Sequence, residues 1–169
     1  MACRVFHWTV VYVVLFDFVC SLSLLFQKRS ISNLSGVYPP ITTPFNQDES
    51  IAWDQLKNNL EKLNQIDLLR GYLVQGSNGE YCYLTPDERV KMIEKVCQWS
   101  SPEKLVLAGS GMESTRATIE MTNAMAKAGA HAAVVITPSY FKSRMTSESL
   151  FQHFNSVADH SSIPVILYR

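Results

Sequence analysis

The chain has 169 residues, of which 47% are hydrophobic and 18% charged, and its formal net charge at pH 7 is zero. This composition can form a globular core and argues against a disordered chain. Balanced charge and the absence of basic stretches interleaved with aromatic residues give no reason to expect a nucleic-acid partner. The cysteines form no C-x-x-C pair and no histidine-rich spacing accompanies them, so we expect free thiols and no metal site.

The first part of the chain differs from the remainder. The stretch from Trp8 to Phe26 is mostly apolar and is followed by two basic residues. Its length allows a membrane anchor or the core of a signal peptide, although Asp17 near its centre would be costly in lipid. It lacks the Arg- and Ser-rich composition of a mitochondrial transit peptide. We interpret residues 1–34 as a leader, either a targeting segment, an anchor or an atypical first exon, and begin the fold at Ser35.

From Gly36 onward, short apolar runs alternate with helical patterns. Strands are predicted in GVYPPITTPF, GYLVQG, KLVLAG, AAVVIT and IPVILY, and helices over Ile51–Leu63, Thr85–Trp99, Ser114–Ala128 and Thr146–Val157. The second helix has the clearest start, because Thr85 can cap it, Pro86 suits its first turn and Glu88 can complete a capping box. Its buried stripe is expected at Val90, Ile93, Val96 and Cys97.

This alternation of about five strands and four helices predicts an α/β fold with a parallel sheet. The pattern alone fits either an open doubly wound sheet or the N-terminal part of a (β/α)8 TIM barrel, which needs about 250 residues. Both architectures place their sites at the carboxyl ends of the strands. The polar residues predicted at or just after those ends are Thr42, Thr43, Ser77, Asn78, Ser110, Thr137, Tyr140 and Tyr168.

Two motifs at the strand ends can carry chemistry. QGSNGE follows the second strand, and it is either a tight turn or a loop in which the Ser77 and Asn78 groups hold a carboxylate. Tyr140 follows the fourth strand and Tyr168 ends the fifth. A single tyrosine there usually packs, whereas two oriented phenols could relay a proton.

Several stretches in the right order and spacing resemble the dihydrodipicolinate synthase / N-acetylneuraminate lyase family. They are GVYPPITTPF, QGSNGEYCYLTPDER, LAGSGMESTRATIEMTNAMAKAGAHAAVVITPSYF and IPVILY, and they extend from Gly36 to Tyr168. The pair Ser77–Asn78 between two glycines resembles the branch of animal mitochondrial 4-hydroxy-2-oxoglutarate aldolases. The resemblance therefore favours the incomplete (β/α)8 barrel for residues 35–169.

The resemblance also implies class I aldolase chemistry without a metal or other cofactor, in which a lysine forms a Schiff base with a 2-oxo acid. Ser77 and Asn78 would bind the substrate carboxylate, and Thr43 would support the floor of that substrate site. Tyr168 would transfer the proton, and Tyr140 would complete the relay of a neighbouring subunit. The implied reaction converts 4-hydroxy-2-oxoglutarate to pyruvate and glyoxylate, with a synthase-like or sialate lyase-like specificity as the alternative.

The Schiff-base lysine of the family would follow a sixth strand, so none is expected in this chain. We therefore expect the chain to be a truncated form that is inactive alone, or a non-catalytic half-barrel that binds or perturbs full-length subunits. The resemblance implies a homo-oligomer, tetramer-like in the full-length family, and a mitochondrial location. The atypical leader leaves a signal peptide or membrane contact open.

Overall fold

The computed structural model describes residues 33–168. The helices are α1 (Trp53–Asn64), α2 (Pro86–Trp99), α3 (Thr115–Lys127) and α4 (Ser147–His160). The strands are β1 (Gly71–Val74), β2 (Leu105–Gly109), β3 (Ala132–Ile136) and β4 (Val165–Tyr168), and three short 3-10 turns lie at Ser77–Gly79, Tyr81–Tyr83 and Lys142–Arg144. Helices and strands alternate along the chain as the sequence predicts.

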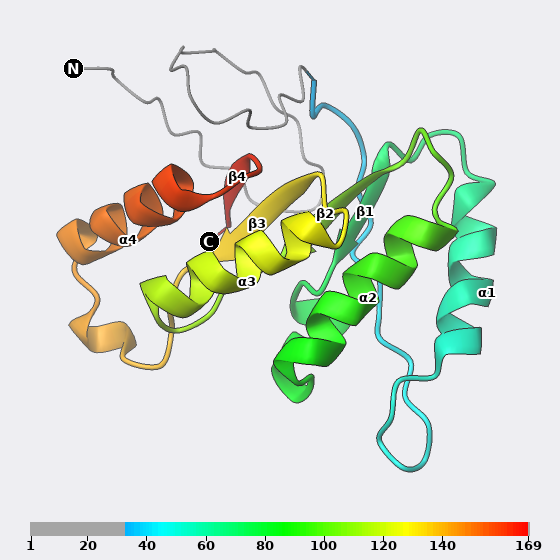
Figure 1. The fold of residues 1–169 in the computed structure, drawn as a ribbon, viewed down its shortest axis with the longest axis horizontal. Coiled ribbons are helices and arrows are strands. Elements are labelled where there is room, and N and C mark those ends of the chain that lie inside the picture. The colour runs from blue at the N-terminus through cyan, green and yellow to red at the C-terminus, as the bar shows by residue number, and fades with distance from the viewer. Residues whose placement is uncertain (1–32, 169) are drawn as a thin grey trace.

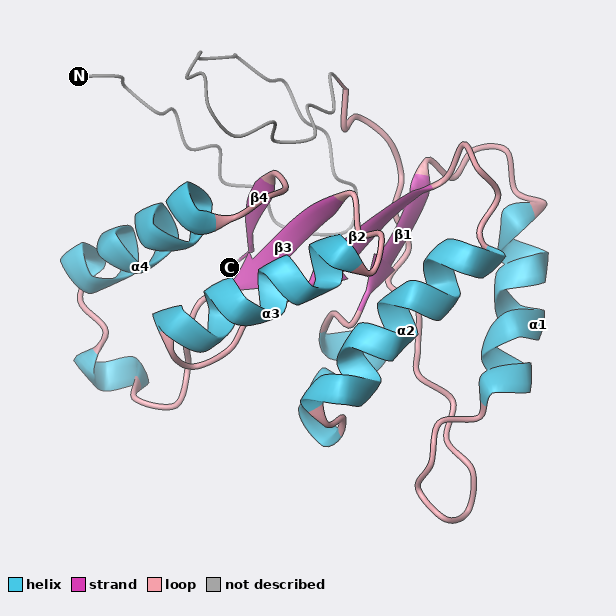
Figure 2. Ribbon diagram, in the orientation of Figure 1, coloured by secondary structure: helices cyan, strands magenta, loops and turns pink. Residues whose placement is uncertain are grey.

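The four strands form one parallel sheet in the order β1-β2-β3-β4. Helices α1 to α4 lie side by side over one face of this sheet (Figures 1 and 2). Each connection therefore runs from the carboxyl end of a strand through a helix to the start of the next strand. This arrangement confirms the predicted α/β fold and is that of consecutive β/α units of a barrel.

The first predicted strand is the one element that the structure does not form as a regular strand. The segment lies beside β1 and makes only isolated bridges, which are parallel between Val37 and Leu69 and between Pro40 and Leu73 and antiparallel between Phe45 and Ile51. The Leu73 N–H donates to the Pro39 carbonyl at 3.0 Å, and the Ile41 N–H donates to the Leu73 carbonyl at 3.0 Å. Pro39 and Pro40 have no N–H to give, so the ladder is interrupted although the segment occupies the position of a strand.

The sheet separates two apolar clusters. The larger lies under the helices and includes Leu60, Tyr72, Ile93, Val106, Met125, Val135 and Phe154. The smaller lies on the opposite face and contains Tyr38, Leu73, Leu107, Ala132 and Val134, with Ile166 and Tyr168 of β4 against it. Both faces of the central strands are thus apolar, which explains their unbroken hydrophobic runs. Every residue of β4 is only half-buried, because β4 pairs with β3 alone among the described strands.

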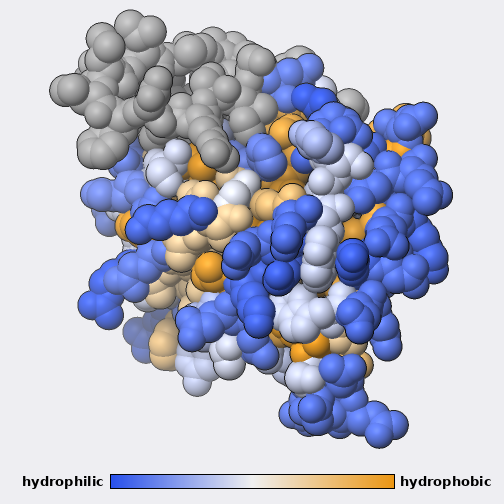
Figure 3. Space-filling model, turned by 45° about the vertical axis from the view of Figure 1, so that its right-hand side comes forward, coloured by the Kyte–Doolittle hydropathy of each residue, from blue (hydrophilic) through white to orange (hydrophobic). Residues whose placement is uncertain are grey.

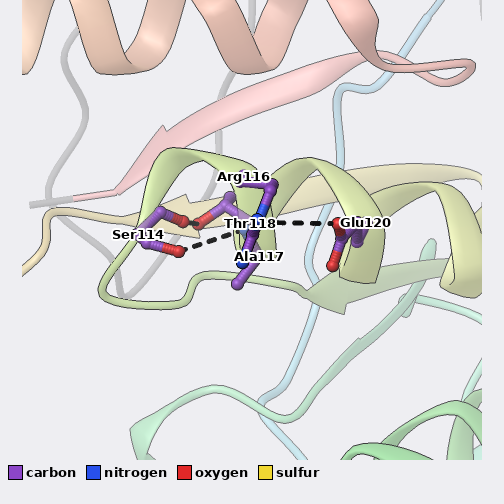
Figure 4. A network of polar contacts seen from close by, with 5 residues as sticks. All are labelled: Ser114, Arg116, Ala117, Thr118 and Glu120. Carbon is purple, nitrogen blue, oxygen red and sulfur yellow. Dashed lines mark hydrogen bonds and ion pairs between the residues drawn. The ribbon is translucent and has the colours of Figure 1, made fainter.

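The helix starts follow the sequence signals closely. Thr85 caps α2 and forms the predicted capping box with Glu88. Ser114 caps α3 by accepting a hydrogen bond from the Ala117 N–H at 3.1 Å, and the Thr118 hydroxyl donates to the Ser114 carbonyl at 2.9 Å (Figure 4). Side-chain caps of this kind stabilise a helix start by about 1 kcal/mol each.

The predicted stripe of α2 was wrong in part. Ile93 and Val96 are fully buried, but Arg89 and Met92 complete the buried face, whereas Val90 and Cys97 are only half-buried. A rotation of the helix by a fraction of a turn accounts for the difference. It brings a charged residue, Arg89, into the interior.

Residues 1–32 and 169 lie outside the described residues, so the proposed leader and the boundary near residue 35 remain predictions. Between residues 33 and 168, no helix combines the length and apolar character needed to cross a membrane. Figure 3 shows a face on which polar residues predominate and apolar residues appear in smaller patches between them.

Two asparagines hold the helix layer together by the same device. The Asn64 side chain at the end of α1 donates to the Trp99 carbonyl at 2.9 Å and accepts from the Ser101 N–H at 3.1 Å. The Asn123 side chain in α3 donates to the His160 carbonyl at 2.9 Å and accepts from the Ser162 N–H at 3.0 Å. Each asparagine thereby satisfies backbone groups at the C-terminal end of the following helix, where carbonyls have no partner within the helix.

We expect Asn64→Ala to destabilise the chain more than Asn123→Ala does. Each asparagine makes three bonds, since Asn64 also accepts the Tyr72 hydroxyl at 2.8 Å and Asn123 the Ser162 hydroxyl at 2.9 Å. The bonds of Asn64 are partly buried whereas those of Asn123 are exposed, so water replaces the lost partner less readily at Asn64. The expected costs are about 2–3 and about 1 kcal/mol, and urea unfolding of the two variants measures them. Equal midpoints would contradict the assigned difference.

His153 makes the stability depend on pH. This α4 residue is 5% exposed, its Nδ1 lies 2.9 Å from the Thr115 hydroxyl, and its Nε2 is buried without a hydrogen-bond partner. Burial lowers the pKa of His153 from its ordinary value of 6.5. As the pH falls through about 6.5, the unfolded chain takes up a proton at His153 more readily than the folded chain does. The unfolding free energy therefore has its full value at higher pH and decreases as the pH is lowered.

We expect His153→Gln to flatten the fall in unfolding free energy between about pH 7 and pH 5. His160 is exposed, and His160→Gln is the matched control that should leave the slope unchanged. Denaturant titrations at each pH measure the effect. An unchanged slope in His153→Gln would show that another group controls it.

Candidate active site

A cavity of about 450 Å³ opens at the carboxyl ends of the strands. Because the strands are parallel, the loops that follow β1 and β2 and the last residues of β3 and β4 all meet there. The residues around it are Val37, Tyr38, Pro39, Pro40, Leu73, Gln75, Gly76, Ser77, Asn78, Tyr81, Arg89, Gly109, Gly111, Val134, Ile136 and Tyr168. The predicted residues Ser77, Asn78 and Tyr168 are thus brought to one cavity.

The segment after β1 turns sharply into the cavity wall. Gln75 has a φ of 62°, in the left-handed region that a non-glycine residue seldom occupies. A 3-10 turn follows, in which the Gly79 N–H donates to the Gly76 carbonyl at 2.9 Å and the Glu80 N–H to the Ser77 carbonyl at 3.1 Å. Ser77 and Asn78 are exposed and line the cavity, so their polar side chains are available to a ligand.

Thr43 lies beneath this turn instead of on the cavity wall. It is 4% exposed, and its hydroxyl donates to the Gly79 carbonyl at 2.6 Å and lies 3.6 Å from the Met92 sulfur. This position fits the expectation that Thr43 supports the floor of the site. Direct contact of its hydroxyl with a substrate would require that bond to break.

The two tyrosines have different surroundings. Tyr168 ends β4, is paired in register with Ile136 of β3 and lines the cavity. Tyr140 is 78% exposed and is not among the cavity residues, and its ring meets that of Phe141 edge-on at 4.8 Å. The described residues therefore do not place the two phenols in one site.

A carboxylate holds the loop that carries Tyr140. The N–H groups of Ser139 and Tyr140 donate to the same oxygen of Glu113, at 3.0 and 2.9 Å. Glu113 follows β2, so this contact ties the loops after two neighbouring strands together.

The sequence patterns did not identify Arg89 and Gln75, two buried residues at the base of the cavity that are among those lining it. Arg89 is 3% and Gln75 1% exposed, and the Arg89 Nε donates to the Gln75 Oε1 at 3.0 Å. The Gln75 amide in turn donates to the Arg89 carbonyl at 2.6 Å. Burial lowers the pKa of the Arg89 guanidinium. A signal did exist, because Arg89 precedes Ile93 and Val96 by helical spacing and so lies on the apolar face of α2.

The described residues contain no group of three or more His, Cys, Asp or Glu side chains placed to hold a metal ion. Of the described residues that line the cavity, none is a lysine. What the cavity offers is short polar side chains at one wall, a phenol at another and a buried guanidinium below. This set can bind and orient a small anion and move a proton.

Fold and site together define a class of protein. A parallel β/α unit with helices on one face and polar groups at the strand ends is the architecture of barrel enzymes that bind small molecules at that end. Comparison with known proteins identifies the family of such proteins to which the chain belongs. The family model "Dihydrodipicolinate synthetase family" matches residues 33–169, and the chain belongs to this family.

Individual relatives agree with the family. The chain is 41% identical over 134 residues to a 4-hydroxy-tetrahydrodipicolinate synthase of Methanothrix thermoacetophila, covering 79% of this chain and 44% of that protein. It resembles the chloride-inhibited dihydrodipicolinate synthase of Acinetobacter baumannii, solved with pyruvate, with a TM-score of 0.75 and 30% identity, over 81% of this chain and 46% of that one.

An N-acetylneuraminate lyase of Mycoplasma synoviae shares the fold, with a TM-score of 0.70 at 20% identity over 78% of this chain and 44% of that one. The chain spans less than half the length of the curated relatives it matches, since it covers 44% of the synthase of Methanothrix thermoacetophila and 46% of the synthase of Methanococcus vannielii. It therefore corresponds to the N-terminal part of a barrel of this family.

We expect Thr43→Val to lower the unfolding free energy by about 1–2 kcal/mol, because the Gly79 carbonyl loses its buried partner. Thr43→Ser keeps the hydroxyl and loses one methyl group, so it should cost less than about 1 kcal/mol. Chemical denaturation of both variants measures the difference. If serine and valine were equally destabilising, the hydroxyl would not be the supporting group.

Proposed function

We propose that this chain supplies the substrate-binding and proton-transfer part of an aldolase that cleaves a 2-oxo acid through a Schiff base. The observation that carries the proposal is that Ser77 and Asn78, which follow the first strand of the sheet, and Tyr168, which ends the last strand, converge on one cavity of about 450 Å³. Membership in a family that contains synthases and lyases supports it. The pyruvate in the Acinetobacter baumannii structure supports a 2-oxo acid as the ligand.

In this proposal, Ser77 and Asn78 hold the carboxylate of the substrate and fix the direction of its oxo carbon. Tyr168 then lies on the opposite side of the cavity, where its phenol can pass a proton to or from the reacting atoms. As the carbon–carbon bond breaks, the protonated imine accepts its electron pair and becomes an enamine, while the phenol path takes the proton of the substrate hydroxyl, whose carbon leaves as the aldehyde. The same path then delivers that proton to the enamine carbon from which the aldehyde departed. Such a division separates ligand orientation from proton transfer.

The nucleophile of this mechanism is a lysine, and we propose that a further strand beside β4 contributes it. Two features support this. The lining residues include no lysine, and β4 has only one hydrogen-bonded neighbour within the described sheet. A strand added there would continue the parallel sheet and place its own carboxyl end at the same cavity. The 169-residue chain would then bind its substrate without converting it to product.

For the substrate we propose 4-hydroxy-2-oxoglutarate, split into pyruvate and glyoxylate, on the basis of the Ser77–Asn78 pair. The names of the curated relatives favour a second candidate, a 4-hydroxy-tetrahydrodipicolinate synthase. An assay of the assembled barrel for release of glyoxylate from 4-hydroxy-2-oxoglutarate distinguishes the two candidates. A mitochondrial location and a homo-oligomeric assembly remain part of the proposal.

We expect the chain to bind pyruvate, and Ser77→Ala to weaken that binding by about three- to thirtyfold, because one hydrogen bond to a charged group is lost. Tyr168→Phe should bind pyruvate with an affinity within about twofold of the unmodified chain, since it removes only a proton path. Ligand-observed NMR titrations give the three dissociation constants.

The opposite order of affinities would reverse the assigned roles. In a complete barrel that contains this chain, Tyr168→Phe should lower kcat, whereas Ser77→Ala should mainly raise KM. An unmodified chain that binds no 2-oxo acid would overturn the proposed function.

A further inference from the structure

We propose that Arg89 acts from below the cavity as a positioning residue that also supplies the positive charge by which the site prefers an anion. The inference rests on the proposed function in one respect, namely that the cavity takes a 2-oxo acid. It concerns a residue that none of the predicted roles includes.

The Arg89 side chain joins the loops that follow two strands. Its Nε donates to the Gln75 Oε1 at 3.0 Å, next to the turn that carries Ser77. Its Nη2 donates to the Gly109 carbonyl at 2.7 Å, at the end of β2. A guanidinium presents its donors in a rigid planar fork, so bonds in two directions fix both loops relative to each other. The unusual backbone of Gln75 is therefore held by side-chain bonds as well as by β1.

The remaining contacts of Arg89 are also to neutral groups. Its Nη1 lies 2.7 Å from the Met112 sulfur, and its Cζ lies 4.9 Å from the centre of the Tyr81 ring. The ion pairs among residues 33–168 are Lys57–Glu61 and Arg116–Glu120, both away from this site. Arg89 is thus a buried cation that carbonyls and a ring stabilise, and no carboxylate within residues 33–168 pairs with it to cancel its charge.

A buried charge without a counter-ion is costly, because burial removes most of its hydration. The cost falls when an anion binds nearby, since Coulomb attraction is strong where solvent is excluded. Arg89 lines the same cavity as Ser77 and Asn78, so a carboxylate held by those two residues would be the missing counter-charge. The site should therefore prefer an anionic 2-oxo acid to its neutral isostere.

The test uses the full 169-residue chain and two probes of nearly equal shape, pyruvate and its neutral amide, pyruvamide. The quantity measured is the ratio of their dissociation constants. We expect Arg89→Met to reduce the preference for pyruvate by about three- to tenfold, as removal of one partly screened charge predicts. Arg89→Lys keeps the charge but not the fork, so it should retain most of the preference. Both variants should lower the melting temperature.

A second variant leaves Arg89 in place and cancels its charge. Gln75→Glu puts a carboxylate at the atom that now accepts the Arg89 Nε at 3.0 Å, and it should reduce the preference as Arg89→Met does. Arg116→Met is the matched control, because Arg116 is an exposed arginine whose loss changes the net charge equally. It should leave the ratio unchanged.

Each result decides the matter. A ratio in Arg89→Met and Gln75→Glu equal to that of the unmodified chain would overturn this inference and leave the proposed function intact. A loss of preference in Arg89→Lys as large as in Arg89→Met would assign the effect to loop geometry and also overturn the role of charge. If the unmodified chain bound neither probe, the proposed function would fail, and this inference with it.

Discussion

The parallel hydrogen bonding of β1 to β4 is the constraint on which the site depends. Because Val74 is paired with Ala108 and Ile136 with Tyr168, the strands end at one edge of the sheet, although the residues there are far apart in the sequence. In a parallel sheet, the loops that follow successive strands all leave the sheet at this edge. The turn after β1 and the phenol at the end of β4 therefore face one cavity although β1 and β4 are not hydrogen-bonded to each other.

Beneath that edge the interior changes from apolar to polar. Farther from the cavity, α2 buries Ile93 and Val96 as an ordinary helix would, but nearer to it the same face carries Arg89. The buried side chains of Thr43, Gln75 and Arg89 each have a partner, and several of the partners are backbone carbonyls of the loops that form the site. A network of this kind contributes less stability than an apolar core of equal volume, but it specifies one loop conformation. We interpret the polar floor as the reason why Gln75 can keep its left-handed backbone at the start of the turn that carries Ser77.

The sequence was sufficient for those features that local signals determine. Apolar runs located β1 to β4, and the Thr85 cap placed the start of α2 to the residue. Prediction from the sequence failed where a tertiary contact determines the local structure. The segment with Pro39 and Pro40 takes the place of a strand without its full ladder, and Arg89 is buried because carbonyls from another unit accept its bonds. Ser77 and Tyr168 could be placed at a common edge from topology alone, whereas the exposure of Tyr140 depends on a loop whose course no pattern indicates.

The two sides of the cavity differ in how firmly they are held. On the β1 side, buried hydrogen bonds from Thr43 and Arg89 fix the turn. On the other side, Tyr168 ends a half-buried strand with one described neighbour, and Tyr140 stands exposed. The proposed carboxylate-binding groups are thus organised within these residues, whereas under the proposed function the phenols would be oriented by further contacts at the edge of β4 and at the loop after β3. If the same added strand also brings the lysine, completion of the sheet and assembly of the catalytic groups become one event, and ligand binding can precede both.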